Sequence, residues 1–290
     1  MFELQEIMND ILRYGNRSPR TIKTYGTYTT AFLEYCVLRD IDPLQIPPDE
    51  IRIFLDNLQL SRGLADTTIN NATSQIKYLL LVNGYPYWDD RLIPFKKVYQ
   101  KAPFVPTREM VEQLINSIDD EHIKEKTMAT LMYSSGMRVS ECCELNCKDI
   151  YKSTWQIRVN HGKGNKERWV ILAPQAYDLI VKYWTGLPQR MRSRDWLFTQ
   201  QTNIANPCDK ELVETFLHNH CKNVGLPNIT PRVLRRAYAT HSIMDGVDIH
   251  DLQALMGHKS VDTTMIYIFY ADVFRARTVP SPLNKMRLHI

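Results

Sequence analysis

Apolar residues recur at helical intervals through the first hundred residues of the chain. One amphipathic segment begins where Ser18 can cap a helix and Pro19 can occupy its first position. A second covers residues 48–58, and a third begins near residue 67 or 68, with Lys77 on its polar face. The apolar faces of the first and third segments consist of Ile22, Tyr25, Phe32, Leu33, Cys36 and Val37, and of Ile69, Ala72, Ile76, Leu79 and Leu80. This pattern predicts a small helical bundle.

The helical pattern stops in the stretch LIPFKKVYQKAPFVP, from Leu92 to Pro106. Three prolines and three lysines fall within these fifteen residues, which is typical of a connecting segment. We therefore expect a first domain over residues 1–98, a linker over 99–106 and a second domain over 107–290.

Helical spacing resumes after the linker, with Thr107 as a candidate N-cap and a break at Gly136 between buried helical segments. The period then changes to two in STWQIRVNHGKGNKERWVIL, which predicts a β-hairpin with lysines at its tip. Its alternating residues are Trp155, Ile157 and Val159 on one strand and Arg168, Val170 and Leu172 on the other. Further helices are expected over 177–184, 210–224, 233–244 and 249–256, the last ending at Gly257, and at the C-terminal end. The predicted fold is mainly α with a small β-sheet.

Composition narrows the class of protein without identifying it. The chain is 44% hydrophobic and 23% charged, as in ordinary globular proteins, and its formal net charge is +4. Its N-terminus carries acids where a signal peptide would be basic, and no apolar run is long enough to span a bilayer, so a cytoplasmic protein without a membrane partner is expected. The six cysteines suggest small buried side chains, with a metal site as a remote alternative. Lys and Arg outnumber Asp and Glu between residues 150 and 200, which weakly indicates a polyanionic partner.

Four separated motifs carry candidate chemistry. They are SGMRVSE around Arg138, HGKGNKER around Lys163, TPRVLRRAYATH around Arg235, and MGHKSVDTTMIY ending at Tyr267. Each motif alone suits a helix end, a solvated turn or a surface charge. Their order along one chain favours a shared site.

With these motifs the sequence resembles the tyrosine recombinase (phage integrase) family. The family's catalytic set is an arginine, a hairpin lysine, a His-x-x-Arg box, a second histidine and a tyrosine nine residues after it, the spacing that His258 and Tyr267 hold here. The stretch SPRTIKTYGTYTTAFLEYC is similar to the family's helical core-binding domain. The resemblance implies a helical core-binding bundle followed by an α+β catalytic domain. No additional arm-binding domain is expected, which favours the Xer-like or transposon-resolvase type.

The chemistry agrees with this resemblance. A tyrosine that attacks a phosphodiester builds up negative charge, and Arg138 and Arg235 could stabilise this charge without a metal or any other cofactor. By resemblance, Lys163 protonates the leaving 5′-oxygen and His258 hydrogen-bonds the phosphate or the tyrosine. We expect Glu141 to orient Arg138. Lys77, Lys166 and Arg168 are candidate DNA-binding residues.

Two residues need a choice between interpretations. Tyr267 has the family spacing from His258 and is the expected nucleophile, whereas Tyr270 is interpreted as a packing residue. Arg232 stands where the family has histidine or sometimes lysine. Arginine keeps a positive charge there but cannot serve as a general base.

We therefore predict a site-specific DNA recombinase that works through a 3′-phosphotyrosine intermediate, in integration, excision or resolution of a mobile element or replicon. Its expected partners are double-stranded DNA with an inverted-repeat core site and three further copies of the chain, forming a homotetramer on two DNA sites. A type IB topoisomerase-like enzyme and a catalytically impaired DNA-binding regulator remain alternatives.

Overall fold

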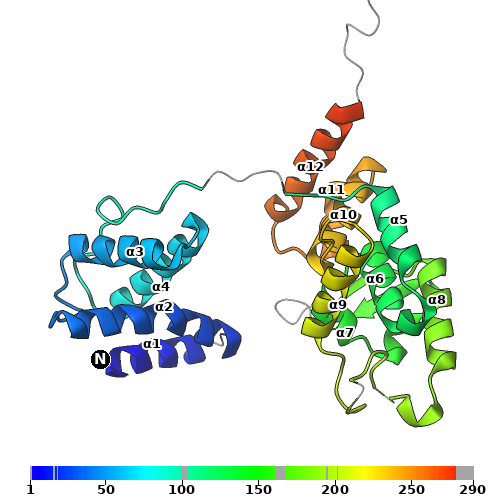
Figure 1. Cartoon of the computed structure of the whole chain (residues 1–290), viewed down its shortest axis with the longest axis horizontal. Coiled ribbons are helices and arrows are strands. Elements are labelled where there is room, and N and C mark those ends of the chain that lie inside the picture. Colours follow the sequence, from blue (N-terminus) through cyan, green and yellow to red (C-terminus); the bar gives the residue numbers. More distant parts are fainter. Residues whose placement is uncertain are drawn as a thin grey trace, which may run out of the picture. The chain divides into compact units, whose positions relative to one another are not determined.

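The computed structural model describes residues 2–15, 17, 19–98, 103–160, 167–193, 195–200 and 202–278. Contacts divide the chain into two compact units, Met1–Lys101 and Ala102–Ile290, each of which is described by itself (Figure 1). The predicted Ser18 cap, part of the predicted linker, and both hairpin lysines, Lys163 and Lys166, lie outside the described residues.

The first unit is a helical bundle around one apolar core (Figure 1, blue to cyan). Its helices are α1 (Phe2–Tyr14), α2 (Pro19–Leu38), α3 (Pro48–Arg62) and α4 (Asp66–Val82). The last three correspond to the segments predicted from the sequence. Helix α1 was not predicted, and it adds to the core through Met8 and Leu12, four residues apart on one helix face.

The second unit contains all the other helices of the described residues. They are α5 (Arg108–Ser117), α6 (Ile123–Ser135), α7 (Val139–Cys143), α8 (Pro174–Gly186), α9 (Lys210–Asn223), α10 (Pro231–Met244), α11 (Ile249–Met256) and α12 (Asp262–Thr278). Short 3₁₀ turns form η1 (Asp120–His122), η2 (Cys147–Asp149) and η3 (Gln189–Met191). As predicted, the chain breaks at Gly136, between α6 and α7.

A small antiparallel sheet accompanies these helices, with β1 (Ile150–Tyr151), β2 (Gln156–Val159) and β3 (Arg168–Ile171) in that order. Val159 pairs with Arg168 and Ile157 with Val170, so the predicted hairpin is confirmed. Strand β1 is an addition to it. The prediction of a mainly α fold with a small β-sheet is therefore confirmed.

Helix α6 lies at the centre of the second unit. Seven of its residues are buried, and they are distributed around all sides of the helix. It packs against α8 and α10, while α10 also packs against α11 and α12 (Figure 1). Helix α11 packs against β3. This packing brings the C-terminal ends of α6 and α11 to one face of α10. Within the described ranges, no helix has the length and apolarity needed to cross a membrane.

The cysteine side chains behave as the sequence suggested. Five of the six are buried, Cys147 is partly exposed, and all are free thiols. Burial raises the pKa of the Cys147 and Cys221 thiols, which keeps both protonated.

Candidate active site

The turn after α6 brings two arginines together. Gly136 ends the helix with a φ of 66°, and a β-carbon there would lie 2.4 Å from Cδ1 of Tyr238, so a larger residue does not fit. The carbonyl of Gly136 accepts a hydrogen bond from Nη1 of Arg235. Two residues further on, Arg138 stands at the N-cap of α7. The SGMR motif thus supplies the carbonyl that accepts from Arg235, and it places Arg138 at the start of α7.

Glu141, in the first turn of α7, is the anionic centre of the site. Its Oε1 and Oε2 accept hydrogen bonds from Nη1 and the backbone N of Arg138, both at 2.7 Å. The same two oxygens accept from Nη1 and Nη2 of Arg168 at 2.8 and 2.7 Å. Burial alone would raise the pKa of Glu141, but the hydrogen bonds and charge of Arg168 and Arg138 outweigh it and lower the pKa to about 2. The carboxylate therefore stays ionised.

Arg235 comes from α10 and is nearly buried, with 10% of its side chain exposed. Its Nη2 donates to the carbonyl of Met256 at 2.6 Å, and its Nη1 lies 3.9 Å from Oε2 of Glu141. Met256 is the last residue of α11, where unpaired carbonyls and the helix dipole both favour a cation. Burial and the neighbouring Arg138 lower the pKa of Arg235 to about 10, and it remains positively charged near neutral pH.

His258 follows directly after the C-cap of α11, Gly257, whose φ is 63°. The Nε2 atom of His258 lies 3.3 Å from Nη2 of Arg235, and its Nδ1 lies 2.9 Å from Oγ1 of Thr264. Because a guanidinium only donates, Nε2 must accept, which leaves Nδ1–H to donate to the buried Thr264. Burial, followed by the charges of Arg235 and Arg138, lowers the pKa of His258 to about 4. The imidazole is therefore neutral near pH 7.

Tyr267 lies on α12 beside this group. Its ring is nearly parallel to that of His258, with an interplanar angle of 17° and 6.1 Å between centroids. Burial raises the pKa of Tyr267, but the charges of Arg235, Arg236 and Arg232 act in the opposite direction. Tyr270 is only 7% exposed and belongs to the apolar core, as expected of a packing residue.

The structure therefore brings Arg138, Glu141, Arg235, His258 and Tyr267 together from four separate segments. Three guanidiniums, with Arg168 included, surround one carboxylate, so the cluster carries an excess of positive charge. An anionic tetrahedral group would be stabilised there, and more strongly as its charge increases. A phenol at the edge of the cluster could attack such a group.

The other predicted site residues lie in different settings. Arg232 is exposed in the first turn of α10, near enough for its charge to act on Tyr267. Arg168 has 9% of its side chain exposed and directs its guanidinium inward. Lys77 belongs to the first unit, where its Nζ contacts Asp90 at 2.6 and 2.8 Å. Lys163 and Lys166 are outside the described residues.

Sequence reasoning missed three contributors to this geometry. Thr264 fixes the ring of His258, and the only signal was its place three residues before Tyr267 in the TT pair. The charge of Arg236 acts on Tyr267, and its Nη1 donates to the carbonyl of Phe104 at 2.9 Å. The inward contacts of Arg168 had no sequence signal at all.

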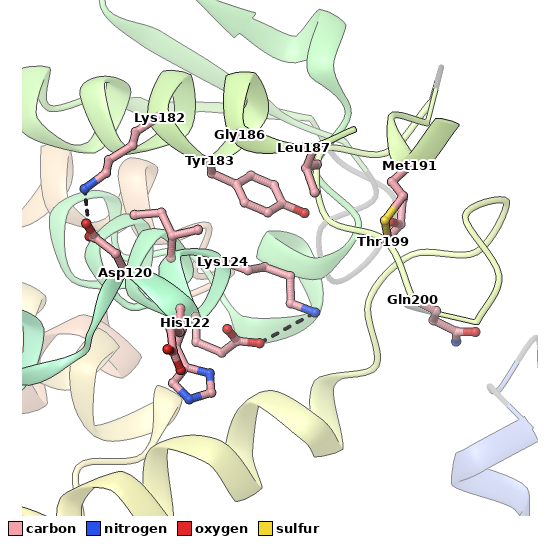
Figure 2. A pocket seen from close by; sticks show the side chains of 13 residues that line it. Asp120, His122, Lys124, Lys182, Tyr183, Gly186, Leu187, Met191, Thr199 and Gln200 are labelled. Carbon is pink, nitrogen blue, oxygen red and sulfur yellow. Dashed lines mark hydrogen bonds and ion pairs between the residues drawn. The ribbon is translucent and has the colours of Figure 1, made fainter. Parts of the chain in front are cut away.

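A cavity of about 570 Å³ elsewhere in the second unit does not include these residues. Figure 2 shows it between η1, the start of α6 and the end of α8, with ion pairs joining Asp120 to Lys182 and Lys124 to Glu125. The candidate active site is thus separate from this cavity, and most of its charged side chains are largely buried.

Comparisons with known proteins agree with the geometry. The family described as Phage integrase family matches residues 105–272, and its N-terminal SAM-like domain matches residues 4–80. Tyrosine recombinase XerD of Halalkalibacterium halodurans is 30% identical over 263 residues, covering 86% of this chain and 87% of XerD. Tyrosine recombinase XerC of Thermodesulfovibrio yellowstonii is 28% identical over 279 residues, covering 92% and 91%.

Solved structures share the fold. XerH site-specific recombinase, bound to its palindromic difH substrate, superposes with a TM-score of 0.74 at 21% identity, over 91% of this chain and 81% of XerH. The Tn1549 transposon integrase, in complex with transposon right end DNA, gives a TM-score of 0.73 at 17% identity, over 96% and 99%. The chain therefore belongs to the phage integrase family and is a tyrosine site-specific recombinase, an enzyme that cuts and rejoins DNA.

Proposed function

We propose that Tyr267 is the nucleophile of this recombinase and that Arg138 and Arg235 bind the phosphate it attacks. The tyrosine oxygen forms a bond to phosphorus while the bond from phosphorus to the 5′-oxygen breaks, which leaves a 3′-phosphotyrosine and a free 5′-hydroxyl. A 5′-hydroxyl of the partner strand then reverses the step and releases the tyrosine. The number of phosphoester bonds is unchanged, so no nucleotide hydrolysis is needed. The placement of Tyr267 beside the arginine cluster is the observation that carries this assignment.

The remaining residues have supporting roles. Lys163 gives a proton to the departing 5′-oxygen, and Glu141 orients Arg138. His258, neutral and held by Thr264, hydrogen-bonds the phosphate or the tyrosine oxygen. Arg232 adds positive charge beside the phosphate without exchanging a proton.

The partner is double-stranded DNA with an inverted-repeat core site, on which four copies of the chain assemble across two sites. The DNA in the XerH and Tn1549 structures supports a DNA partner, and the palindromic substrate of XerH supports an inverted-repeat site. Lys77 and Lys166 contact the DNA backbone. Residues 1–98 form the core-binding domain, 99–106 the linker and 107–290 the catalytic domain, and the enzyme acts in the cytoplasm.

A suicide substrate tests the function. Binding sites would first be selected from a random-sequence duplex library, and the selected site then synthesised with a nick beside the cleavage position, so that the short 5′-hydroxyl strand diffuses away. We expect a covalent protein–DNA adduct on a denaturing gel, linked through a peptide that contains Tyr267. A purified chain that binds the selected site without forming any adduct would contradict the proposal and favour a DNA-binding regulator. Adduct formation without dependence on the site would favour a topoisomerase.

A further inference from the structure

Arg168 holds together three separate segments of the candidate active site. It stands at the first position of β3, and its Nη1 and Nη2 donate to the two oxygens of Glu141 at 2.8 and 2.7 Å. The N–H of its third side-chain nitrogen, Nε, donates to the carbonyl of Leu255 at 2.8 Å. One guanidinium thus joins the sheet to the segment that carries Arg138 and to the end of α11, three residues before His258.

Close packing leaves this side chain little freedom. A β-carbon on Gly257 would lie 2.9 Å from Cδ of Arg168 and 3.2 Å from its Nε, so the absence of a side chain at Gly257 makes room for the arginine. Only 9% of the Arg168 side chain is exposed. A residue that binds DNA backbone needs accessible donors, whereas all three nitrogens of Arg168 have partners within the protein.

From this geometry we propose that Arg168 is a positioning residue, which fixes Glu141 and the end of α11 relative to each other and so sets the positions of Arg138 and His258. This inference rests on the proposed function, because it concerns the same site. It also replaces the DNA-binding role that the sequence suggested for Arg168. A lysine cannot substitute for it, since a single ammonium cannot reach both carboxylate oxygens and the carbonyl in this planar arrangement.

The pKa of Glu141 offers a test that separates a positioning role of Arg168 from a general loss of protein stability. The charged groups that face Glu141 within the described residues are Arg168, Arg138 and Arg235. Arg168 is the strongest of the influences that keep the pKa of this buried carboxylate low. Without its charge, Glu141 would take up a proton at a higher pH and release its hold on Arg138.

The test compares Arg168→Lys and Arg168→Gln with a matched control, Arg158→Lys. Arg158 lies on the adjacent strand β2 and forms a similar fork, with Nε and Nη2 at 2.9 and 2.7 Å from Oδ1 of the buried Asp149, outside the candidate site. Single-turnover cleavage of the suicide substrate, DNA affinity over a range of salt concentrations, and thermal unfolding would be measured for all three variants.

We expect both Arg168 variants to cleave about a hundredfold more slowly, the loss typical of a small misplacement of reacting groups, while binding DNA with unchanged affinity and salt dependence. In Arg168→Gln the fall in cleavage rate on acidification should also begin at a higher pH than in the wild type. Arg158→Lys should cleave like the wild type.

Four results would overturn the proposal. The first is a normal cleavage rate in Arg168→Lys, and the second is an equal loss of cleavage rate in Arg158→Lys. The third is weaker DNA binding by the Arg168 variants with a salt slope reduced by about one, as for a lost phosphate contact. The fourth is failure of both Arg168 variants to fold. Failure of the proposed function would look different, because the wild-type protein itself would then form no adduct.

Discussion

The ring of Tyr267 lies nearly parallel to that of His258, with their centroids 6.1 Å apart, and the ring of Tyr270 is turned by 75° against that of Tyr267. Two tyrosines on one helix therefore have different surroundings. The charges of Arg235 and Arg138 act on Tyr267, whereas Tyr270 is buried in the core, where the charges that act on it are those of Arg236 and Arg232.

This difference predicts that Tyr267→Phe abolishes the covalent adduct, because the attacking oxygen is gone, while DNA binding is retained. Tyr270→Phe removes a buried hydroxyl and should still form the adduct. The measurement is adduct formation on the nicked substrate, with a gel-shift assay for binding. An adduct in Tyr267→Phe would make the assignment of the nucleophile wrong.

Arg232 should be less important than Arg138 and Arg235, because it is exposed and acts at a distance on Tyr267. Arg138→Ala and Arg235→Ala should each lower the cleavage rate by roughly 10²–10³, the typical loss of one transition-state donor. Arg232→Ala should lose less, and Arg232→Lys and Arg232→His should stay active. The check is single-turnover cleavage with binding measured separately. If Arg232→Ala were as slow as Arg235→Ala, Arg232 would be a primary catalytic group.

Thr264 should matter for chemistry through His258. In Thr264→Val the buried Nδ1–H of His258 loses its acceptor, which typically costs about 1–3 kcal/mol, so we expect cleavage to fall about tenfold while binding persists. Thr264→Ser keeps the hydroxyl and serves as the matched control. Equal cleavage rates in Thr264→Val and the wild type would show that the hydroxyl does not hold the imidazole for catalysis.

Cleavage should persist in excess EDTA, since Arg138, Arg235 and Lys163 are expected to supply the positive charge at the phosphate. Binding should weaken steeply with salt, as for any protein that contacts many phosphates. The assay is adduct formation with and without chelator at constant ionic strength. Activity that is lost with EDTA and restored by magnesium would contradict the mechanism.

Stability should fall on mild acidification partly because of His258. Its pKa in the folded protein is lowered from 6.5 to about 4, mainly by burial, so between these values the unfolded chain binds the extra proton. This contribution to stability is complete above about pH 6.5 and is lost as the pH falls towards 4. His258→Gln, which has no proton to gain, should show a smaller drop in melting temperature between pH 7 and 4. Identical drops in both proteins would contradict the buried, neutral state of His258.

Local sequence signals predicted much of this fold. The period-two pattern gave the β2–β3 hairpin, and Gly136 marked the break between α6 and α7, because these features depend on neighbouring residues. Helix α1 was missed although Leu4, Met8 and Leu12 recur at helical spacing, and its place in the bundle depends on packing against α2 and α4.

The candidate site was predictable only where residue type and spacing carry the chemistry. The pair His258 and Tyr267 could be found because Tyr267 is the ninth residue after His258, which is the spacing of the family that the sequence resembles. The role of Arg168 could not, because Glu141 is 27 residues away in the chain and Leu255 is 87 residues away. An arginine at a strand end looks the same in sequence whether it faces DNA or a buried carboxylate.

Arg235 and Arg168 are held partly by the main-chain carbonyls of Gly136, Leu255 and Met256. Every residue type carries such a carbonyl, so the side chains of Leu255 and Met256 can change without removing an acceptor. What must be kept is the path of the backbone, which Gly136 and Gly257 determine through their positive φ angles. Enzymes of this kind can therefore diverge widely in sequence around the arginines while the guanidiniums stay in place. When such sites are designed or transferred to another scaffold, the two helix ends have to be copied together with the catalytic side chains.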